Sequence, residues 1–378
     1  MRVALNGTAL LSPLTGIGQY TYHLAQGLRD MPGVELDIFY GSGWSKDIRS
    51  SAPPRVATLK TLVTRHIPNS YAVARFVRQY RFNAGMREQR SDVYHEPNFL
   101  AFKSRSPAVI TVHDLSWIRY PESHPVDRVR SMNQFFEPAL KRASLILTDS
   151  VFVKNELIDV FGMRPEMIVP VLLGVEPLFR PQTAEATHAV LEAHGLVHGQ
   201  YVLAVGTLEP RKNLKTALEA FAMLPAEIRR RFPMIIVGMK GWHTSDLEKQ
   251  LAPMVASGEV RLLGYVSRED LATIIAGALT LVYPSIYEGF GLPPLEAMAC
   301  GVPVITSDIA SLPEVVGDTG MLVHPHDREA IRDAILRMAE DPAFRQDLSQ
   351  RSLARSAQFT WERCVAQTVD AYRSVITK

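Results

Sequence analysis

Cysteine is scarce in this sequence, and long uninterrupted runs of apolar residues are missing. Only Cys300 and Cys364 occur among 378 residues, too few for a disulfide framework or a thiolate metal cluster. No apolar run reaches the roughly 18 residues that a membrane-spanning helix requires. Residues 1–7 are too few and too polar for a secretory signal. These features predict a protein of the reducing cytoplasm.

Motifs for several kinds of chemistry are also missing. The sequence has no Asp-x-Asp pair, no phosphate-binding Walker loop and no Gly-x-Ser-x-Gly nucleophile turn. His194 and His198 are spaced like metal ligands, but Gly195 lies between them without an acidic partner in step, so we interpret both as solvated. Zinc-finger spacing, RNA-binding aromatic motifs and sustained basic runs are missing too. We therefore expect no metal, no cofactor and no nucleic-acid partner.

Positive charge is distributed unevenly along the chain. The net charge is +2, yet residues 1–180 hold 22 Lys and Arg against 16 Asp and Glu. The remaining residues hold 19 against 23. Within residues 46–90, ten basic residues accompany two acidic ones and alternate with apolar side chains. This composition predicts basic amphipathic helices, which contact either an anionic membrane surface or solvent. Both interpretations stay open at this point.

Length and periodicity favour two α/β domains. A chain of 378 residues exceeds what one core usually holds, and 47% apolar residues suffice for two. Predicted strands at residues 2–6 and 34–40 flank a predicted helix, and this βαβ pattern predicts a parallel sheet. A second alternating series begins at residue 201. We predict an N-terminal domain at 1–180, a linker at 181–198, a C-terminal domain at 199–358 and a last helix, 359–378, that returns to the N-terminal domain.

The segment from Glu288 to Glu296, Glu-Gly-Phe-Gly-Leu-Pro-Pro-Leu-Glu, is the most informative stretch. Pro293 and Pro294 suit a first helical turn, where their missing N–H groups are unbonded anyway, and Gly301 suits the position after the helix. The free N–H groups of the loop and helix start favour negative charge. Two carboxylates beside an anion site fit a nucleotide sugar, which has a diphosphate and hydroxyl-rich ends. The alternative is an ordinary strand–turn–helix with solvated glutamates.

Other candidate residues lie at predicted strand ends. Arg211 and Lys212 follow the first strand of the second domain at a helix start, where cations are disfavoured unless they bind an anion such as a diphosphate. His113 ends a strand of the first domain, at the edge where ligands of doubly wound sheets gather, and it is either a ligand contact or structural. Gly16 and Gly18 lack the third glycine of a dinucleotide motif, so they form either a ligand loop or a plain connection.

Together these residues resemble the retaining glycosyltransferases of glycosyltransferase family 4, which have the GT-B fold. The resemblance covers nearly the whole chain. It rests on the Gly16-Ile-Gly18 loop, His113-Asp114, Gly206-Thr-Leu-Glu-Pro-Arg-Lys-Asn213 and Pro284-Ser-x-x-Glu-Gly-Phe-Gly-Leu-Pro-x-x-Glu-Ala-Met-Ala-x-Gly301. The segment Leu173-Gly-Val-Glu176 departs from the family's frequent Asn-Gly-Val-Asp, which bears on the hinge and not on the class. The resemblance implies GT-B architecture, with two Rossmann-like domains facing each other across a cleft.

The family pattern implies a role for each matching residue. Glu288, His113, Arg211 and Lys212 would be the catalytic set, with Glu288 and the loop backbone on the donor sugar. Glu296 would bind the ribose hydroxyls, while Arg211, Lys212 and Gly18 would hold the diphosphate. The remaining donor-binding positions implied are Gly16, Gly206, Thr207, Gly264, Tyr265, Val266, Gly289, Phe290, Gly291 and Leu292.

The resemblance also implies metal-independent hexosyl transfer with retention of anomeric configuration. Retention is usually explained by front-face attack, in which the leaving phosphate helps to deprotonate the acceptor. Similar members look like bacterial mannosyl- or rhamnosyltransferases of O-antigen or exopolysaccharide assembly, so we expect GDP-mannose as donor and a lipid-linked or growing polysaccharide as acceptor. Rival hypotheses are a GT-B nucleotide-sugar epimerase and a non-catalytic glycan-binding partner. We expect a cytoplasmic location, peripheral on the inner face of the cell membrane.

Overall fold

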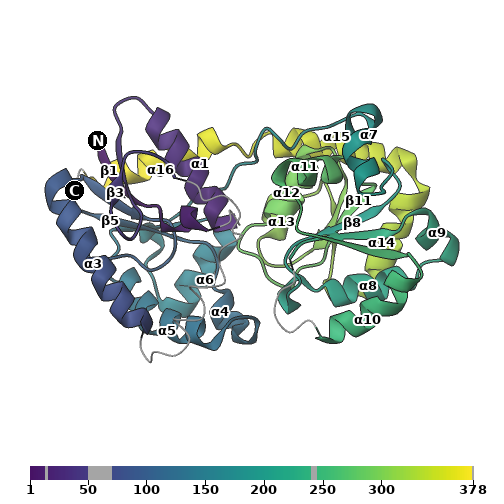
Figure 1. The fold of residues 1–378 in the computed structure, drawn as a ribbon, viewed down its shortest axis with the longest axis horizontal. Coiled ribbons are helices and arrows are strands. Elements are labelled where there is room, and N and C mark those ends of the chain that lie inside the picture. The colour runs from purple at the N-terminus through teal and green to yellow at the C-terminus, as the bar shows by residue number, and fades with distance from the viewer. Residues whose placement is uncertain (13–15, 50–69, 240–244, 377–378) are drawn as a thin grey trace.

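The computed structural model describes residues 1–12, 16–49, 70–239 and 245–376, which form two α/β domains side by side (Figure 1). Within these ranges, one sheet has seven strands in the order β3-β2-β1-β4-β5-β6-β7, and the other has six in the order β10-β9-β8-β11-β12-β13. Their strands pair in parallel, except that β2 and β3 are antiparallel. The predicted α/β class with two Rossmann-like domains is confirmed.

The first sheet has helices on both faces. Its strands are β1 (Arg2–Asn6), β2 (Glu35–Phe39), β3 (Trp44–Ser45), β4 (Val93–Glu96), β5 (Ala108–Val112), β6 (Leu145–Thr148) and β7 (Ile168–Pro170). The helices are α1 (Gly16–Asp30), α3 (Ser70–Gln89), α4 (Ser116–Arg119), α5 (Val126–Leu140) and α6 (Val151–Phe161), with 3-10 turns η1 (Thr8–Leu11), η2 (Pro121–Ser123) and η3 (Pro165–Met167). Strand residues alternate between two apolar clusters, Val3 in one and Ala4 in the other. The strands are apolar throughout because both faces are covered.

The second sheet is covered in the same way. Its strands are β8 (Val202–Val205), β9 (Met234–Val237), β10 (Val260–Gly264), β11 (Thr280–Tyr283), β12 (Val304–Ser307) and β13 (Met321–Val323). The helices are α7 (Ala184–Ala193), α8 (Leu214–Ala222), α9 (Ala226–Arg231), α10 (Ser245–Ala256), α11 (Arg268–Ala276), α12 (Leu292–Ala299), α13 (Leu312–Val316), α14 (Arg328–Glu340) and α15 (Pro342–Ser356), with the 3-10 turn η4 (Pro210–Lys212). Two apolar clusters again lie on opposite faces of the sheet.

The chain crosses between the domains twice. The last helix, α16 (Trp361–Ile376), packs against α1 and places the C-terminal end of the chain in the N-terminal domain (Figure 1). The two crossings touch at Gly174, where an added Cβ would lie 2.2 Å from the backbone nitrogen of Trp361. Residues 181–198, expected as a linker, contain α7. This helix packs against α11, and Leu191 lies in the C-terminal core, so the segment is part of that domain.

Only part of the basic region 46–90 falls within the described residues. Residues 46–49 and 70–90 are described, and α3 (Ser70–Gln89) supplies a helix there, whereas the prediction for residues 50–69 lies outside them. Phe82 is buried on α3, while Phe76 and Tyr80 are 76% and 74% exposed. None of the helices in the described ranges combines the length and apolar character needed to cross a bilayer.

Candidate functional site

A cavity of about 420 Å³ lies between the two domains, at the carboxyl ends of both sheets. Its size is typical of small-molecule sites. Most residues predicted for the site line this cavity: Gly16, His113, Gly206, Thr207, Arg211, Lys212, Gly264, Tyr265, Val266, Glu288, Gly289, Phe290, Gly291, Leu292 and Glu296. Gly18 does not line it, because it is buried in the first turn of α1 and only Gly16, Ile17 and Gln19 of that turn reach the wall.

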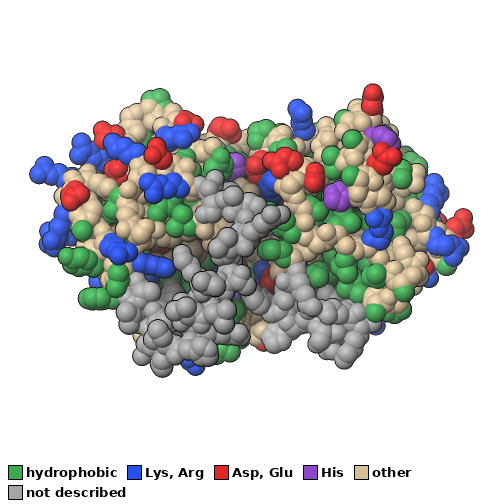
Figure 2. All heavy atoms as spheres, in the orientation of Figure 1, with side chains coloured by type: hydrophobic (Ala, Val, Ile, Leu, Met, Phe, Trp, Pro, Cys, Tyr) green, Lys and Arg blue, Asp and Glu red, His purple; other side chains and the backbone are tan. Residues whose placement is uncertain are grey.

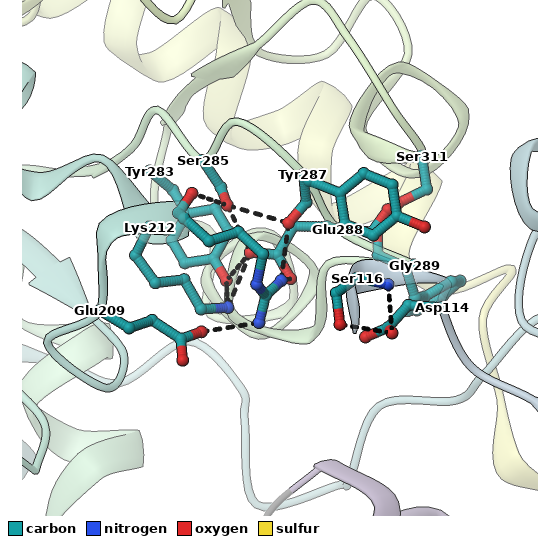
Figure 3. Close-up of polar contacts among 12 residues, drawn as sticks. Asp114, Ser116, Glu209, Lys212, Tyr283, Ser285, Tyr287, Glu288, Gly289 and Ser311 are labelled. Carbon is teal, nitrogen blue, oxygen red and sulfur yellow. Dashed lines mark hydrogen bonds and ion pairs between the residues drawn. The ribbon is translucent and has the colours of Figure 1, made fainter. Parts of the chain in front are cut away.

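Glu288 is the centre of the C-terminal wall. Its carboxylate accepts hydrogen bonds from Lys212 Nζ at 2.7 Å, Tyr283 Oη at 2.8 Å and Ser285 Oγ at 2.6 Å, and from Arg211 Nη1 at 3.1 Å (Figure 3). The residue is only 8% exposed. Its carboxylate is therefore bonded within its own domain and contacts both cations. The family resemblance instead implies that Glu288 contacts the donor sugar and that the two cations hold the diphosphate.

Charge balance keeps Glu288 ionised. Burial alone raises the pKa of its carboxyl, but Lys212 and Arg211 outweigh burial and lower the pKa to about 2. Burial also lowers the pKa of the Lys212 ammonium more than Glu288 raises it. We assign an ionised pair, because four donors converge on the carboxylate.

Arg211 is held by three hydrogen bonds within its own domain. Its Nη1 donates to Tyr287 O at 2.6 Å, and its Nη2 donates to Glu209 Oε1 at 2.7 Å. Its buried Nε has no hydrogen-bond partner among the described residues. Asn213 fixes the turn that carries both cations, because its Nδ2 donates to the carbonyls of Pro284 and Pro325 at 3.0 and 2.6 Å. A rigid turn thus places two cations, Arg211 and Lys212, in the wall of the cavity, which suits a phosphate group.

Two glycines allow the loop after β11 to take its path. Gly289 lies directly against the N-terminal domain, since an added Cβ would sit 1.7 Å from His113 O. Gly291 has a φ of 118°, in the left-handed region that favours glycine. Ser311 Oγ lies 2.9 Å from Glu288 O and 2.8 Å from Phe290 O and holds the loop from behind. Figure 3 shows Asp114 beside Gly289 on the opposite side of the cleft.

Helix α12 begins and ends as the sequence predicts, within one residue. Both prolines lie in its first turn, and Gly301 follows it with a φ of 72°. The N–H groups of Gly301 and Val302 bond back to Met298 O and Ala297 O, which is a Schellman motif. Glu296 is 3% exposed and pairs with Arg268 at 2.7 Å. Burial raises the pKa of the Glu296 carboxyl more than Arg268 lowers it.

The N-terminal wall carries a buried histidine–carboxylate pair. His113 Nδ1 lies 2.7 Å from Asp149 Oδ2, and His113 Nε2 donates to Pro97 O at 2.7 Å. Asp149 is 4% exposed, and its Oδ1 has no hydrogen-bond partner among the described residues. Both ring nitrogens of His113 are therefore occupied by the protein itself.

The walls are joined by hydrogen bonds that run between the domains. Ser150, the N-cap of α6, accepts from Val153 N at 3.2 Å and donates to Gly289 O at 2.7 Å. Glu314 of α13 accepts from Val151 N at 2.9 Å, so a carboxylate of one domain sits on a helix N-terminus of the other. Tyr287 Oη accepts from Leu115 N at 2.8 Å. The structure is thus a closed arrangement of the two domains.

Sequence reasoning missed four residues that shape the cavity: Asp149, Glu209, Arg268 and Tyr283. Asp149 and Tyr283 follow or end strands, and that position is the signal that could have found them. Arg268 has no such signal, because only the fold brings the first turn of α11 to Glu296. In the described part of the chain, no three His, Cys, Asp or Glu side chains are grouped so that they could hold a metal ion.

Two family models match the chain in succession. The one described as Glycosyltransferase Family 4 matches residues 14–177, and the one described as Glycosyl transferases group 1 matches residues 193–355. O-antigen chain mannosyltransferase B of Escherichia coli is 38% identical to this chain and covers 99% of it and 100% of its own length. The identity extends over both domains, so the likeness covers both walls of the cavity.

Solved structures share the whole fold. Sucrose-phosphate synthase from Thermosynechococcus elongatus aligns with a TM-score of 0.78 at 22% identity, over 100% of this chain and 99% of its own. An Anabaena protein in complex with UDP-glucose aligns with a TM-score of 0.73 at 19% identity, over 99% and 100%. These likenesses confirm the GT-B architecture, and the family matches favour glycosyl transfer over an epimerase or a silent binding partner. The chain is a glycosyltransferase and belongs to glycosyltransferase family 4.

Proposed function

We propose that this enzyme transfers a mannosyl residue from GDP-mannose to a growing, lipid-linked cell-surface polysaccharide, with retention of configuration and without a metal ion. The observation that carries the proposal is the cavity between the domains. Its walls contain two cations, Arg211 and Lys212, and side chains that can accept hydrogen bonds from sugar hydroxyls. The choice of sugar and pathway is supported by the name of the E. coli relative, an O-antigen chain mannosyltransferase.

The cation pair provides the electrostatic part of the mechanism. Transfer breaks the bond between the anomeric carbon and the diphosphate oxygen, and negative charge grows on the leaving nucleoside diphosphate. Arg211 and Lys212 line the cavity, where they can stabilise that charge, and the N-termini of α1 and α12 face the same cavity. The proton of the attacking acceptor hydroxyl passes to a leaving phosphate oxygen, so charges balance without a metal.

In the proposed mechanism, Glu288 acts neither as an acid nor as a base. A carboxyl whose pKa is about 2 is a weak proton acceptor at neutral pH, and four donors already occupy this one. Its role in the proposed mechanism is to hold Arg211 and Lys212 in place. The backbone of Gly289 to Gly291 then contacts the sugar.

Contact with a membrane surface belongs to the same proposal. Phe76 and Tyr80 are four residues apart on α3, so they share one face, and both are largely exposed. Arg78 and Arg81 are exposed beside them, and Lys and Arg side chains are frequent over this domain in Figure 2. Exposed aromatic rings among arginines suit the surface of an anionic bilayer, which also carries lipid-linked acceptors.

The test is a transfer assay with lipid-linked acceptor glycan and a panel of labelled nucleotide sugars. We expect transfer from GDP-mannose that survives EDTA, gives an α-linked product and increases on phosphatidylglycerol vesicles. Transfer from another nucleotide sugar alone would overturn the donor, and inversion to a β-linked product would overturn retention. Loss of activity in EDTA that Mg²⁺ restores would contradict the metal-free mechanism. Equal activity on phosphatidylcholine and phosphatidylglycerol vesicles would contradict the proposed membrane contact.

A further inference from the structure

The N-terminal wall of the cavity contains a buried acceptor atom that the protein leaves unpaired. Asp149 directly follows β6, lines the cavity and is 4% exposed. Its Oδ2 is bonded to His113, whereas its Oδ1 has no hydrogen-bond partner among the described residues. A buried polar atom without a partner destabilises the protein, so such an atom in a cavity wall marks a place where a ligand can supply the missing partner.

Protonation leaves Oδ1 as a pure acceptor. The carbonyl of Pro97 can only accept, so Nε2 of His113 carries a proton. One further proton lies between Nδ1 and Asp149 Oδ2. Burial lowers the pKa of His113, but Asp149 and the Pro97 carbonyl outweigh it and raise the pKa, while burial raises the pKa of Asp149 as well. We assign the proton to the imidazole, because two acceptors surround the ring; either location leaves Oδ1 free to accept.

Neighbouring contacts place this oxygen near the donor sugar. Ser150, the next residue after Asp149, donates to Gly289 O at 2.7 Å. Gly289 also packs against His113 O, because a Cβ added to this glycine would lie 1.7 Å from that oxygen. The loop that holds the donor in the proposed function therefore lies directly against the pair. Asp149 and the loop from Gly289 to Gly291 line the same cavity, so a sugar ring held by the loop lies beside the N-terminal wall.

We propose that Asp149 Oδ1 accepts a hydrogen bond from one hydroxyl of the transferred hexose, which makes Asp149 a residue that determines sugar specificity. The inference rests on the proposed glycosyl transfer and adds to it the group that recognises the sugar. The pair is neutral overall, so it favours a hydroxyl over a charged group, and a desolvated carboxylate oxygen is a strong acceptor. His113 then acts as a positioning residue that fixes the carboxylate.

The consequence is measurable discrimination against one deoxy sugar. A site built to bond a hydroxyl rejects the analogue that lacks it, because the buried acceptor is left unpaired. A single hydrogen bond to a charged group corresponds to roughly 10- to 100-fold in kcat/KM. Without the carboxylate, the ratio of kcat/KM between the hexose and this deoxy analogue falls toward one. The ratios for deoxy analogues that lack other hydroxyls do not change.

The experiment measures kcat/KM for GDP-mannose and its 2-, 3-, 4- and 6-deoxy analogues with wild type, Asp149→Ala and Asp149→Asn. The matched control is Asp159→Ala, an exposed position on α6. We expect one analogue to be 10- to 100-fold poorer with wild type and equal to GDP-mannose with Asp149→Ala. Affinity for GDP, which lacks the sugar, is expected to be unchanged in both variants and shows that they are folded. Asp149→Asn, nearly the same shape, serves if the alanine variant does not fold.

Other results overturn the proposal in distinguishable ways. Unchanged discrimination in both Asp149 variants rules out the assigned hydrogen bond. Loss of discrimination among deoxy acceptors instead of deoxy donors would assign the oxygen to the acceptor glycan and contradict our assignment. If wild type uses another nucleotide hexose and not GDP-mannose, the proposed donor is wrong, and the same deoxy series on that hexose decides the role of Asp149.

Discussion

The two walls of the cavity differ in how their charged groups are satisfied. On the C-terminal wall, Glu288, Arg211 and Lys212 form a network in which the carboxylate has four donors. On the N-terminal wall, His113 and Asp149 form one neutral pair with a spare acceptor. In the proposed function, the first wall contacts the diphosphate and the second contacts the hydroxyls of the sugar. A nucleotide sugar has these two ends in this order.

The difference also bears on stability. Breaking a buried ion pair by removing one partner leaves an uncompensated charge, which is more costly than losing the pair as a whole. The C-terminal wall should therefore be sensitive in folding as well as in activity. The N-terminal wall should be sensitive mainly in specificity, because its unpaired oxygen is not used by the fold.

The largest effect is expected for Glu288→Ala, which breaks the charged wall. Lys212 loses its carboxylate partner and Arg211 keeps only Glu209, so we expect the free energy of unfolding to fall by about 3–5 kcal/mol and transfer to fall by at least about 100-fold. Urea unfolding and the transfer assay measure both. Glu137→Ala removes a carboxylate from an exposed pair with Lys141 and should change stability by less than about 1 kcal/mol. Equal effects of the two substitutions would contradict the buried network.

A smaller effect is expected for Gly289→Ala, which separates the walls. The new methyl group would meet the backbone of His113, and backbone cannot yield as a side-chain tip can. We expect incomplete closure, a kcat reduced by roughly 100-fold and a larger radius of gyration in X-ray scattering with donor bound. Gly43→Ala is the control, because no atom of the described residues lies within 4 Å of its added Cβ. Wild-type activity of Gly289→Ala would show that the contact is not needed.

The smallest effect is expected in the pH dependence of stability, through the buried carboxyl of Glu96 next to the N-terminal wall. Glu96 precedes Pro97, and burial raises its pKa from 4.5 to about 7 although Asn6 and Tyr94 donate to it. Between these pH values the folded protein keeps a proton that the unfolded chain has released. The free energy of unfolding therefore falls as pH rises from 4.5 through 7, by up to about 3 kcal/mol.

Urea unfolding of wild type and Glu96→Gln at pH 5 and pH 8 isolates this contribution. We expect wild type to lose more stability than the variant on going to pH 8, since glutamine has no proton to release. Parallel pH dependence of the two proteins would show that Glu96 does not titrate in this window.

Much of the C-terminal wall could be predicted because it is nearly continuous in sequence. The segment from Glu288 to Gly301 contains its own loop, proline start and glycine stop, and all follow local backbone rules. The pairing of Glu288 with Arg211 and Lys212 could not be predicted, because more than 70 residues separate them. The sequence therefore indicated residues that line the cavity, but not how their charges are paired.

The N-terminal wall was harder to predict because its parts come from three strand ends. His113 bonds to Asp149 across 36 residues and to Pro97 across 16, and only the sheet order brings β4, β5 and β6 together. Residues 181–198 show a related limit. Their mixed composition resembles a linker, yet Leu191 is buried because a neighbouring helix, α11, covers it.

The division of labour between the walls is tested most directly by isothermal titration of wild type, Lys212→Ala and Asp149→Ala with GDP and with GDP-mannose. Lys212→Ala is predicted to weaken both ligands by the same factor, because both contain the diphosphate. Asp149→Ala is predicted to leave GDP binding unchanged and to weaken GDP-mannose alone. Equal weakening of both ligands by Asp149→Ala, or unchanged GDP binding by Lys212→Ala, would contradict the account.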